Sequence, residues 1–378
     1  MPPPVHVKSQ TVRRRTGVDI FLLIMKVAMS GFVILGFLMF IGQQIDPNNF
    51  IASRINPDAT GLTAAQFEGL IISGLSQGAM YGLIALGYSM VYGVLGFINF
   101  AHGEVFMVGA MTGMITSNKF DDAGLWESNF LLSLAIVLLI AIICSTLTAV
   151  TMERVAYRRL RGSPRLIPLI TSIGVSFFLQ NVSIALLGPR AKTYPALPDW
   201  LSKKRELLGF ISIDGPRLLV LIVATVAMLA LWFLIEKTRT GKAMRAVAED
   251  KEIASLMGIN VNRTIVTTFA VGGAMAGVAG ILWGLLFRSV TAVTGFLPGI
   301  KAFSAAVVGG IGNMGGAMAG GVTLGGAESV APLVLLEPWG INGVSQLKDA
   351  VAFLVLIFVL LVKPTGLFGE RLSSEDRA

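Results

Sequence analysis

The chain has 378 residues, of which 54% are hydrophobic and only 14% are charged, whereas a soluble domain typically carries about 25% charged residues. Its net charge of +8 falls in short segments between apolar blocks. That pattern is typical of a protein that crosses a membrane several times, and it excludes a nucleic-acid binder with one basic face. A single cysteine and two histidines exclude an internal disulfide framework and a thiolate or histidine metal site.

Ten apolar blocks predict membrane-embedded helices, because a helix needs about 20 apolar residues to cross a bilayer. The blocks lie at residues 20–42, 67–94, 98–118, 130–151, 166–187, 216–236, 264–287, 299–312, 314–333 and 348–363. We expect an all-α polytopic membrane protein whose last glycine-rich pair, near 299–333, is short or broken.

Three parts are expected along the chain. Residues 1–66 form an N-terminal extension with one membrane anchor and an external linker, residues 67–369 the main transmembrane domain, and residues 370–378 a cytoplasmic tail. The first block is preceded by three arginines, so a cleaved signal peptide is the alternative. Its length and the lack of a cleavage site before Gln43 favour a retained anchor.

The distribution of lysine and arginine predicts the orientation. With the N-terminus in the cytoplasm, 18 of the 30 basic residues lie inside, 11 lie outside and Lys26 lies in a span. Six of the outside residues lie in the loop 188–217. Because cytoplasmic loops carry the excess of positive charge, we expect both termini in the cytoplasm.

Glycine recurs at four-residue spacing, which allows helix backbones to approach closely in lipid. The rows are Gly74, Gly78 and Gly82; Gly273 and Gly277; and Gly312, Gly316 and Gly320. Half of the stretch 309–326 is glycine, which predicts a broken or re-entrant helix pair that lines a cavity. The stretches "VLGFINFAHG" (94–103) and "VVGGIGNMGG" (307–316) share four residues and hint at an internal repeat.

Three polar residues, Asn99, His102 and Glu104, lie where one apolar block ends and the next begins. They can act structurally, with Asn99 as a helix cap and Glu104 bonded to His102 or lying near a helix N-terminus. Alternatively they line a solute pathway, together with Gly312 and Asn313 of the similar stretch. A proton relay is disfavoured because further carboxylates are absent from this stretch.

The longest inside segment, 236–263, carries six positive and four negative charges. Thr240 or Gly241 can begin one short helix, Asp250 can cap a second, and Gly258 can end the second in the left-handed conformation. The second helix has an apolar side that includes Ile253, Leu256 and Met257. Either the protein or a partner must cover that side, or the helix lies in the membrane interface.

Several motifs closely resemble the permease subunits of branched-chain amino-acid ABC importers (LivH type). They are "GLSQGAMYGLIALGYSMVYGVLGFINFAHGEVFMVGAM", "ERVAYRRLR", "LITSIGVSFFLQN", "RAVAEDKEIASLMGINVNR", "KAFSAAVVGGIGNMGGAMAGG" and "LLVKPTGLFG", in family order from about Gln66 to Gly369. Family members usually begin near Gln66 of this chain, so the N-terminal extension is a departure.

The resemblance implies a bacterial inner-membrane subunit that pairs with a second, homologous permease. Two ATP-binding subunits would dock on the cytoplasmic side, and a periplasmic solute-binding protein would deliver leucine, isoleucine, valine or a related solute. It also implies that the segment 240–260 is the ATPase coupling loop. The candidate coupling residues are Arg245, Glu249, Asp250, Ile253, Leu256, Met257 and Gly258.

This chain lacks a GxxxxGK[ST] phosphate-binding motif, so we expect a transport subunit without enzymatic activity or a cofactor, and ATP bound by the partner subunits. Relatives that move urea, amides or other amino acids remain an alternative. A stand-alone secondary transporter would carry several intramembrane charges, and here the evident candidates are Lys26, Glu104 and Glu328. An intramembrane enzyme would need converging nucleophiles or metal ligands, which one cysteine and one intramembrane histidine do not supply.

Overall fold

The computed structural model describes residues 17–45, 63–164, 166–207, 211–339, 341 and 343–369. The basic residues before residue 17, most of the expected external linker and the tail 370–378 lie outside the described residues.

Ten helices match the ten apolar blocks, which confirms the all-α polytopic class. They are α1 (Gly17–Ile45), α3 (Ala64–Leu95), α4 (His102–Asp122), α6 (Phe130–Met152), α7 (Leu166–Leu187), α9 (Gly215–Lys237), α12 (Val261–Phe287), α13 (Phe296–Gly309), α14 (Met314–Ala331) and α15 (Lys348–Val362). Within the described ranges, eight helical segments are long and apolar enough to cross a membrane. α13, with 14 residues, is short as expected, whereas α14 continues through two irregular turns into a 26-residue segment.

Short elements connect these helices. The short helices are α5 (Leu125–Ser128), α8 (Asp199–Ser202), α10 (Arg239–Glu249) and α11 (Lys251–Leu256), and the irregular turns are η1 (Glu153–Tyr157), η2 (Arg158–Leu160), η3 (Pro332–Leu336), η4 (Glu337–Trp339) and η5 (Val344–Leu347). The strands are β1 (Lys192–Thr193), β2 (Lys204–Leu207), β3 (Ile211–Asp214) and β4 (Ser289–Val290). β1 pairs with β4 and β2 with β3, both antiparallel. These strands have two to four residues and are too short to show an alternating pattern, so neither pair was predicted from the sequence.

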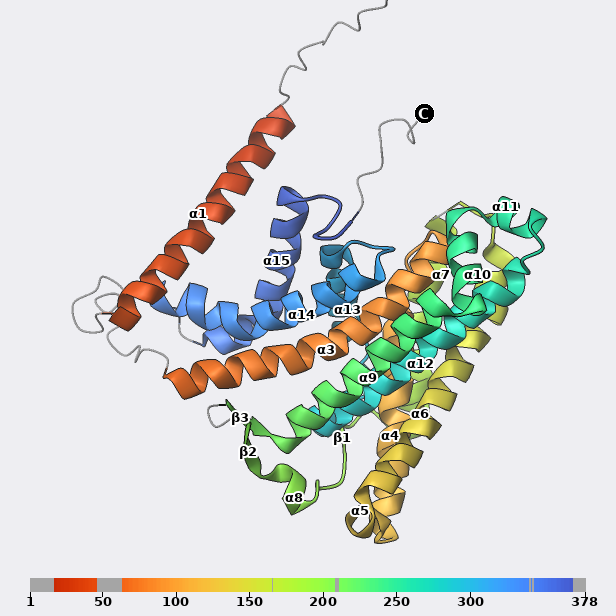
Figure 1. Cartoon of the computed structure of the whole chain (residues 1–378), viewed down its shortest axis with the longest axis horizontal. Helices are drawn as coiled ribbons and strands as arrows, with labels where there is room; N and C mark the ends of the chain where they lie inside the picture. Colours follow the sequence, from red (N-terminus) through yellow and green to blue (C-terminus); the bar gives the residue numbers. More distant parts are fainter. Residues whose placement is uncertain are drawn as a thin grey trace, which may run out of the picture.

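α3 forms the centre of the bundle and contacts α14, α12, α13 and α9 (Figure 1). Every residue from Ser76 to Val91 is buried, which fits a helix that is apolar on all sides. The helix starts at a capping box: the Gln66 amide N–H donates to Thr63 Oγ1, and the Thr63 amide N–H donates to Gln66 Oε1.

The glycine rows hold helices in backbone contact. A Cβ atom added at Gly78 would lie 2.8 Å from the Gly321 carbonyl oxygen, so α3 and α14 touch through their main chains. Gly273 and Gly277 likewise lie against α6. In the third row, a Cβ atom added at Gly312 would meet no atom within 4 Å, and Gly312 has a φ of +93°, so its predicted role in close helix packing is wrong. It is a turn residue that uses the left-handed conformation open to glycine.

α1 lies at the periphery of the bundle (Figure 1). Its buried residues are Gly36, Met39 and Gln43. Gly36 lies against the Leu335 backbone, and the Phe32 ring stacks on Trp339 with centroids 5.9 Å apart. Most of the other residues of this apolar helix are exposed, as expected for a helix that faces lipid.

Candidate functional site

Two interruptions of the helices lie side by side. Gly96 (φ +78°) ends α3, and residues 97–101 are not helical before α4 begins. Gly310 (φ +108°) ends α13, and the chain then turns into α14. Ile98 of the first interruption and Ile311 of the second line the same small cavity, and the Gly312 amide N–H donates a 2.9 Å hydrogen bond to Ser89 Oγ in α3. The two interruptions coincide with the two stretches that share four residues.

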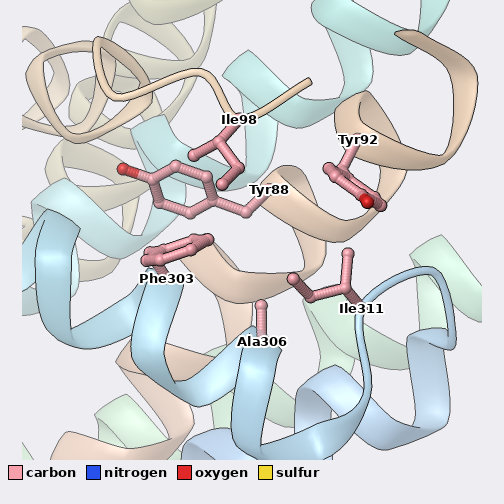
Figure 2. Close-up of a pocket in the computed structure, with 6 residues that line it drawn as sticks. All are labelled: Tyr88, Tyr92, Ile98, Phe303, Ala306 and Ile311. Atoms are coloured by element: carbon pink, nitrogen blue, oxygen red, sulfur yellow. The ribbon is translucent and has the colours of Figure 1, made fainter. Parts of the chain in front are cut away.

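An aromatic cluster, formed by Tyr88, Phe100 and Phe303, occupies the space between the interruptions. The Phe303 ring lies 5.9 Å from Tyr88 and 5.8 Å from Phe100, centroid to centroid. Figure 2 shows the small cavity beside it, with residues contributed by α3, the following segment, α13 and the turn after α13: Tyr88, Tyr92, Ile98, Phe303, Ala306 and Ile311. Its volume is about 10 Å³, which is room for at most one water molecule. The cluster is therefore closed to a solute.

Asn99, His102 and Glu104 are all buried, but they face three different elements. Asn99 Oδ1 accepts a 2.7 Å hydrogen bond from the Tyr157 hydroxyl of η1. His102 packs edge-on against Tyr88 at 4.9 Å and fits against Gly87. Glu104 Oε1 accepts from Gln180 at 2.7 Å and from Ser176 at 3.0 Å, both on α7.

These contacts decide between the structural expectations. The N-cap of α4 is Ala101, so Asn99 does not cap the helix with its side chain, and that expectation is wrong. Glu104 does not bond to His102 but lies in the first turn of α4, near the helix N-terminus as the alternative predicted, and it bonds to α7. Each residue nevertheless keeps one buried polar atom without a hydrogen-bond partner: Asn99 Nδ2, His102 Nε2 and Glu104 Oε2. Burial of an unpartnered polar atom costs about 1–3 kcal/mol, so these atoms mark places where a water molecule or solute group would be stabilised.

Asn313 caps α14, because its Oδ1 accepts from the Gly316 amide N–H at 2.9 Å. Its Nδ2 donates to the Phe368 carbonyl at 3.1 Å. The C-terminal segment, residues 363–369, thus lies on the end of α13. There the Leu367 and Phe368 amides donate to the carbonyls of Val308 and Gly309 at 2.7 and 2.9 Å.

An ion triad, formed by Lys301, Glu328 and Asp349, joins α13, α14 and α15. Lys301 Nζ lies 2.7 Å from Glu328 Oε1 and 2.5 Å from Asp349 Oδ1. Lys301 and Glu328 are buried, whereas the Asp349 side chain is half exposed. Of these three residues, Glu328 was identified from the sequence, whereas Lys301 and Asp349 were not. Lys301 could have been found, because a lysine inside the apolar block 299–312 indicates a buried charge that needs a partner.

The segment 236–263 folds into two short helices at one end of the bundle (Figure 1). Thr238 caps α10, which therefore starts at Arg239 and not at Thr240 or Gly241 as predicted. Asp250 caps α11 through hydrogen bonds from the amides of Glu252 and Ile253, as predicted. Gly258 has a φ of +82° and follows the helix end, which also agrees with the prediction.

One side of α11 is apolar and exposed. The side chains of Leu256, Met257 and Ile253 are 86%, 77% and 60% exposed, whereas Ala254 is buried against the bundle. Arg245 pairs with Glu236 at 3.2 Å and donates to the Ile235 carbonyl, so it fixes α10 on the end of α9. Glu249 is the last residue of α10 and is exposed.

Comparison with known proteins gives the family. Residues 70–360 match the family described as "Branched-chain amino acid transport system / permease component". The chain belongs to this family, and it is a multi-pass membrane protein.

Similar proteins cover most of the same region. The high-affinity branched-chain amino acid transport system permease protein BraD of Pseudomonas aeruginosa is 43% identical over 79% of this chain and 95% of its own length. The corresponding LivH protein of Escherichia coli strain K12 is 43% identical over 79% of this chain and 94% of its own. A probable LivH permease of Methanocaldococcus jannaschii is 28% identical over 76% and 88%.

Proposed function

We propose that this chain is the translocation subunit of a binding-protein-dependent ABC importer for leucine, isoleucine, valine or closely related amino acids. The observation that carries the proposal is the exposed apolar side of α11, in a chain 43% identical to branched-chain amino acid permeases over nearly their whole length. α11 is a short helix that lies outside the membrane-spanning helices and exposes large apolar side chains. Such a helix has the features of a surface on which a partner protein docks.

In this proposal α10 and α11 form the coupling loop, and Ile253, Leu256 and Met257 insert into a groove on an ATP-binding subunit. The chain itself binds no ATP and performs no chemical step. It pairs with a second permease subunit in the bacterial inner membrane and has both termini in the cytoplasm. A periplasmic binding protein delivers the amino acid.

The pathway proposed from the sequence runs along the two helix interruptions. The closed aromatic cluster of Tyr88, Phe100 and Phe303 is its gate, and Gly312 and Asn313 form the hinge between α13 and α14. Asn99, His102 and Glu104 offer their unpartnered atoms to the solute when the gate opens. A movement of the coupling loop would shift the equilibrium between the closed and the open gate, because an ATP-bound partner stabilises one of these two states.

Reconstitution tests the proposal. The chain is co-expressed with its neighbouring transport subunits, purified as a complex and placed in liposomes, and uptake is measured with a panel of leucine, isoleucine, valine, urea and a short amide. We expect ATP-dependent uptake of the branched-chain amino acids that requires the binding protein. Uptake restricted to urea or amides would reassign the solute, and uptake without ATP-binding subunits would support a secondary transporter instead.

A further inference from the structure

A cavity of about 520 Å³ lies behind α11, between the end of α3, the turn after η2 and the start of α12. The residues of its wall that bear on its chemistry are Gly96, Arg161, Ser163, Pro168, Lys251 and Asn262. Lys251 lies on the side of α11 opposite to Leu256 and Met257, and its Nζ donates to the Leu95 carbonyl at 3.4 Å. The cavity is therefore distinct from the exposed apolar side of the coupling loop.

The wall of this basic cavity carries an excess of positive charge. Arg161 forms an ion pair with the buried carboxylate of Glu153 and donates to Asn262 Oδ1. Glu153 also pairs with Arg158 at 3.2 Å, so one carboxylate faces two arginines while Lys251 has no acidic partner among the described ion pairs. Arg161 Nε is buried without a hydrogen-bond partner. Burial, and then the charge of Arg161, lower the pKa of Lys251. The second of these causes reflects a positive potential at Lys251, and a positive potential attracts an anion.

The apolar surface next to the basic cavity faces outward. Val155 on η1 and Leu166 and Ile170 on α7 are 72%, 68% and 67% exposed, and η1 contacts α7. The cavity wall itself includes Pro168 of α7 and Leu160 of η2, which directly follows η1. A free anion would use only the cations. A phospholipid would use both parts, with its phosphate at Lys251 and Arg161 and its acyl chains along α7.

We propose that the basic cavity binds the headgroup of an anionic phospholipid. Basic pockets between helices at the membrane boundary are suited to such headgroups. The site lies behind the coupling loop, so a bound lipid would hold α11 against the bundle through Lys251. This proposal does not depend on the transported solute or on the direction of transport.

The test is lipid binding by the purified full-length chain in detergent, followed by native mass spectrometry. Dioleoylphosphatidylglycerol is titrated against dioleoylphosphatidylcholine at equal concentrations, and we expect the anionic lipid to bind more tightly. Lys251→Gln should weaken its binding roughly fivefold, because one basic residue near an anionic headgroup contributes about 1 kcal/mol and 1.4 kcal/mol is a factor of ten. Arg161→Lys keeps the charge and should retain most of the binding.

The matched control is Arg159→Gln, which removes the same charge from an exposed residue two positions before Arg161 and outside the cavity wall. Its binding should equal that of the wild type, and thermal melting checks that every variant is folded. The proposal would be overturned if Lys251→Gln bound the anionic lipid as tightly as the wild type does. It would also be overturned if Arg159→Gln lost as much binding as Lys251→Gln. Complete displacement of the lipid by inorganic phosphate would assign the cavity to a free anion instead. Displacement on addition of ATP-binding subunits would assign it to a protein contact.

Discussion

Lys301 Nζ lies 2.7 Å from Glu328 Oε1, and this buried ion pair joins the short helix α13 to α14. Asp349 of α15 bonds to the same lysine at 2.5 Å. α13 is too short to cross a membrane by itself, so its position depends on contacts of this kind. The ion triad therefore fixes the half-helix that carries Phe303 of the proposed gate.

Lys301→Met should destabilise the protein, because it leaves the Glu328 carboxylate buried without a cation. Removal of one partner of a buried ion pair typically costs about 3–5 kcal/mol. The double variant Lys301→Met/Glu328→Leu removes both charges and should recover most of that loss. Thermal melting in detergent measures both. A double variant no more stable than Lys301→Met would show that Glu328 is not the group left uncompensated.

Gly316→Leu should block transport. A Cβ atom at this position would lie 2.5 Å from the Gly309 carbonyl oxygen, so a leucine forces α13 and α14 apart. Overpacking costs about 1–3 kcal/mol, which is enough to shift a two-state gate. The control is Gly326→Leu in the same helix, where an added Cβ meets nothing within 4 Å. Equal uptake by Gly316→Leu and the wild type would rule out the close contact.

Leu256→Asp should uncouple the ATP-binding subunits while the chain stays folded, since the side chain is 86% exposed in the isolated subunit. Burial of a leucine in a partner groove contributes roughly 1.5–3 kcal/mol. Gly258→Val should do similar harm, because a β-branched residue resists a φ of +82°. The measurements are a pull-down of the ATPase and solute-stimulated ATP hydrolysis.

Lys242→Ala is the control for this loop, because Lys242 is exposed on α10. Lys251 is exposed as well, but its bond to the Leu95 carbonyl and its place in the basic cavity make it a less neutral control. Retention of both ATPase association and stimulated hydrolysis by Leu256→Asp would favour a helix that lies in the membrane interface.

Tyr194 should make stability depend on alkaline pH. It lies in the segment between α7 and α9, its ring packs on Gly284, and its hydroxyl donates to the Ala110 carbonyl at 2.5 Å. Burial raises the pKa of this hydroxyl above its ordinary value. A raised folded-state pKa stabilises the fold below the unfolded pKa of about 10, and this contribution is lost as the pH rises above that value.

The melting temperature of the wild type should therefore fall more steeply above pH 10 than that of Tyr194→Phe. At neutral pH the phenylalanine variant should be the less stable one, by about 1 kcal/mol for the lost hydrogen bond. Parallel pH profiles for the two proteins would show that Tyr194 ionises freely in the folded state.

The N-terminal anchor should be retained and dispensable for assembly. α1 packs on the bundle through a few residues around Gly36, and the family match starts at residue 70. Intact mass of the membrane-extracted protein should include residues 1–42. A variant without residues 1–60 should still copurify with its partner subunits, and failure to do so would assign α1 a role in assembly.

The sequence was sufficient for the helices and the α11 cap because these depend on local signals. A membrane helix is indicated by one continuous apolar block of about 20 residues. The start and the end of α11 are determined by Asp250 directly before the helix and Gly258 shortly after it. Lys301 was missed as an ion-pair residue because its partners are 27 and 48 positions away, and only the packing of α13 against α14 and α15 brings them together. The contacts of Asn99 and Glu104 were missed for the same reason. Their partners Tyr157 and Gln180 are 58 and 76 positions away, and local spacing carries no information about a partner of that kind.

The C-terminal segment has a consequence for the order in which the proposed gate is assembled. The carbonyls at the end of α13 accept hydrogen bonds from Leu367 and Phe368, which follow α13, α14 and α15 in the sequence. During synthesis the ribosome therefore releases α13 and α14 before the residues that bond to the end of α13. A protein truncated before residue 367 would leave these two carbonyls without their partners, and an unsatisfied backbone group is costly in a membrane.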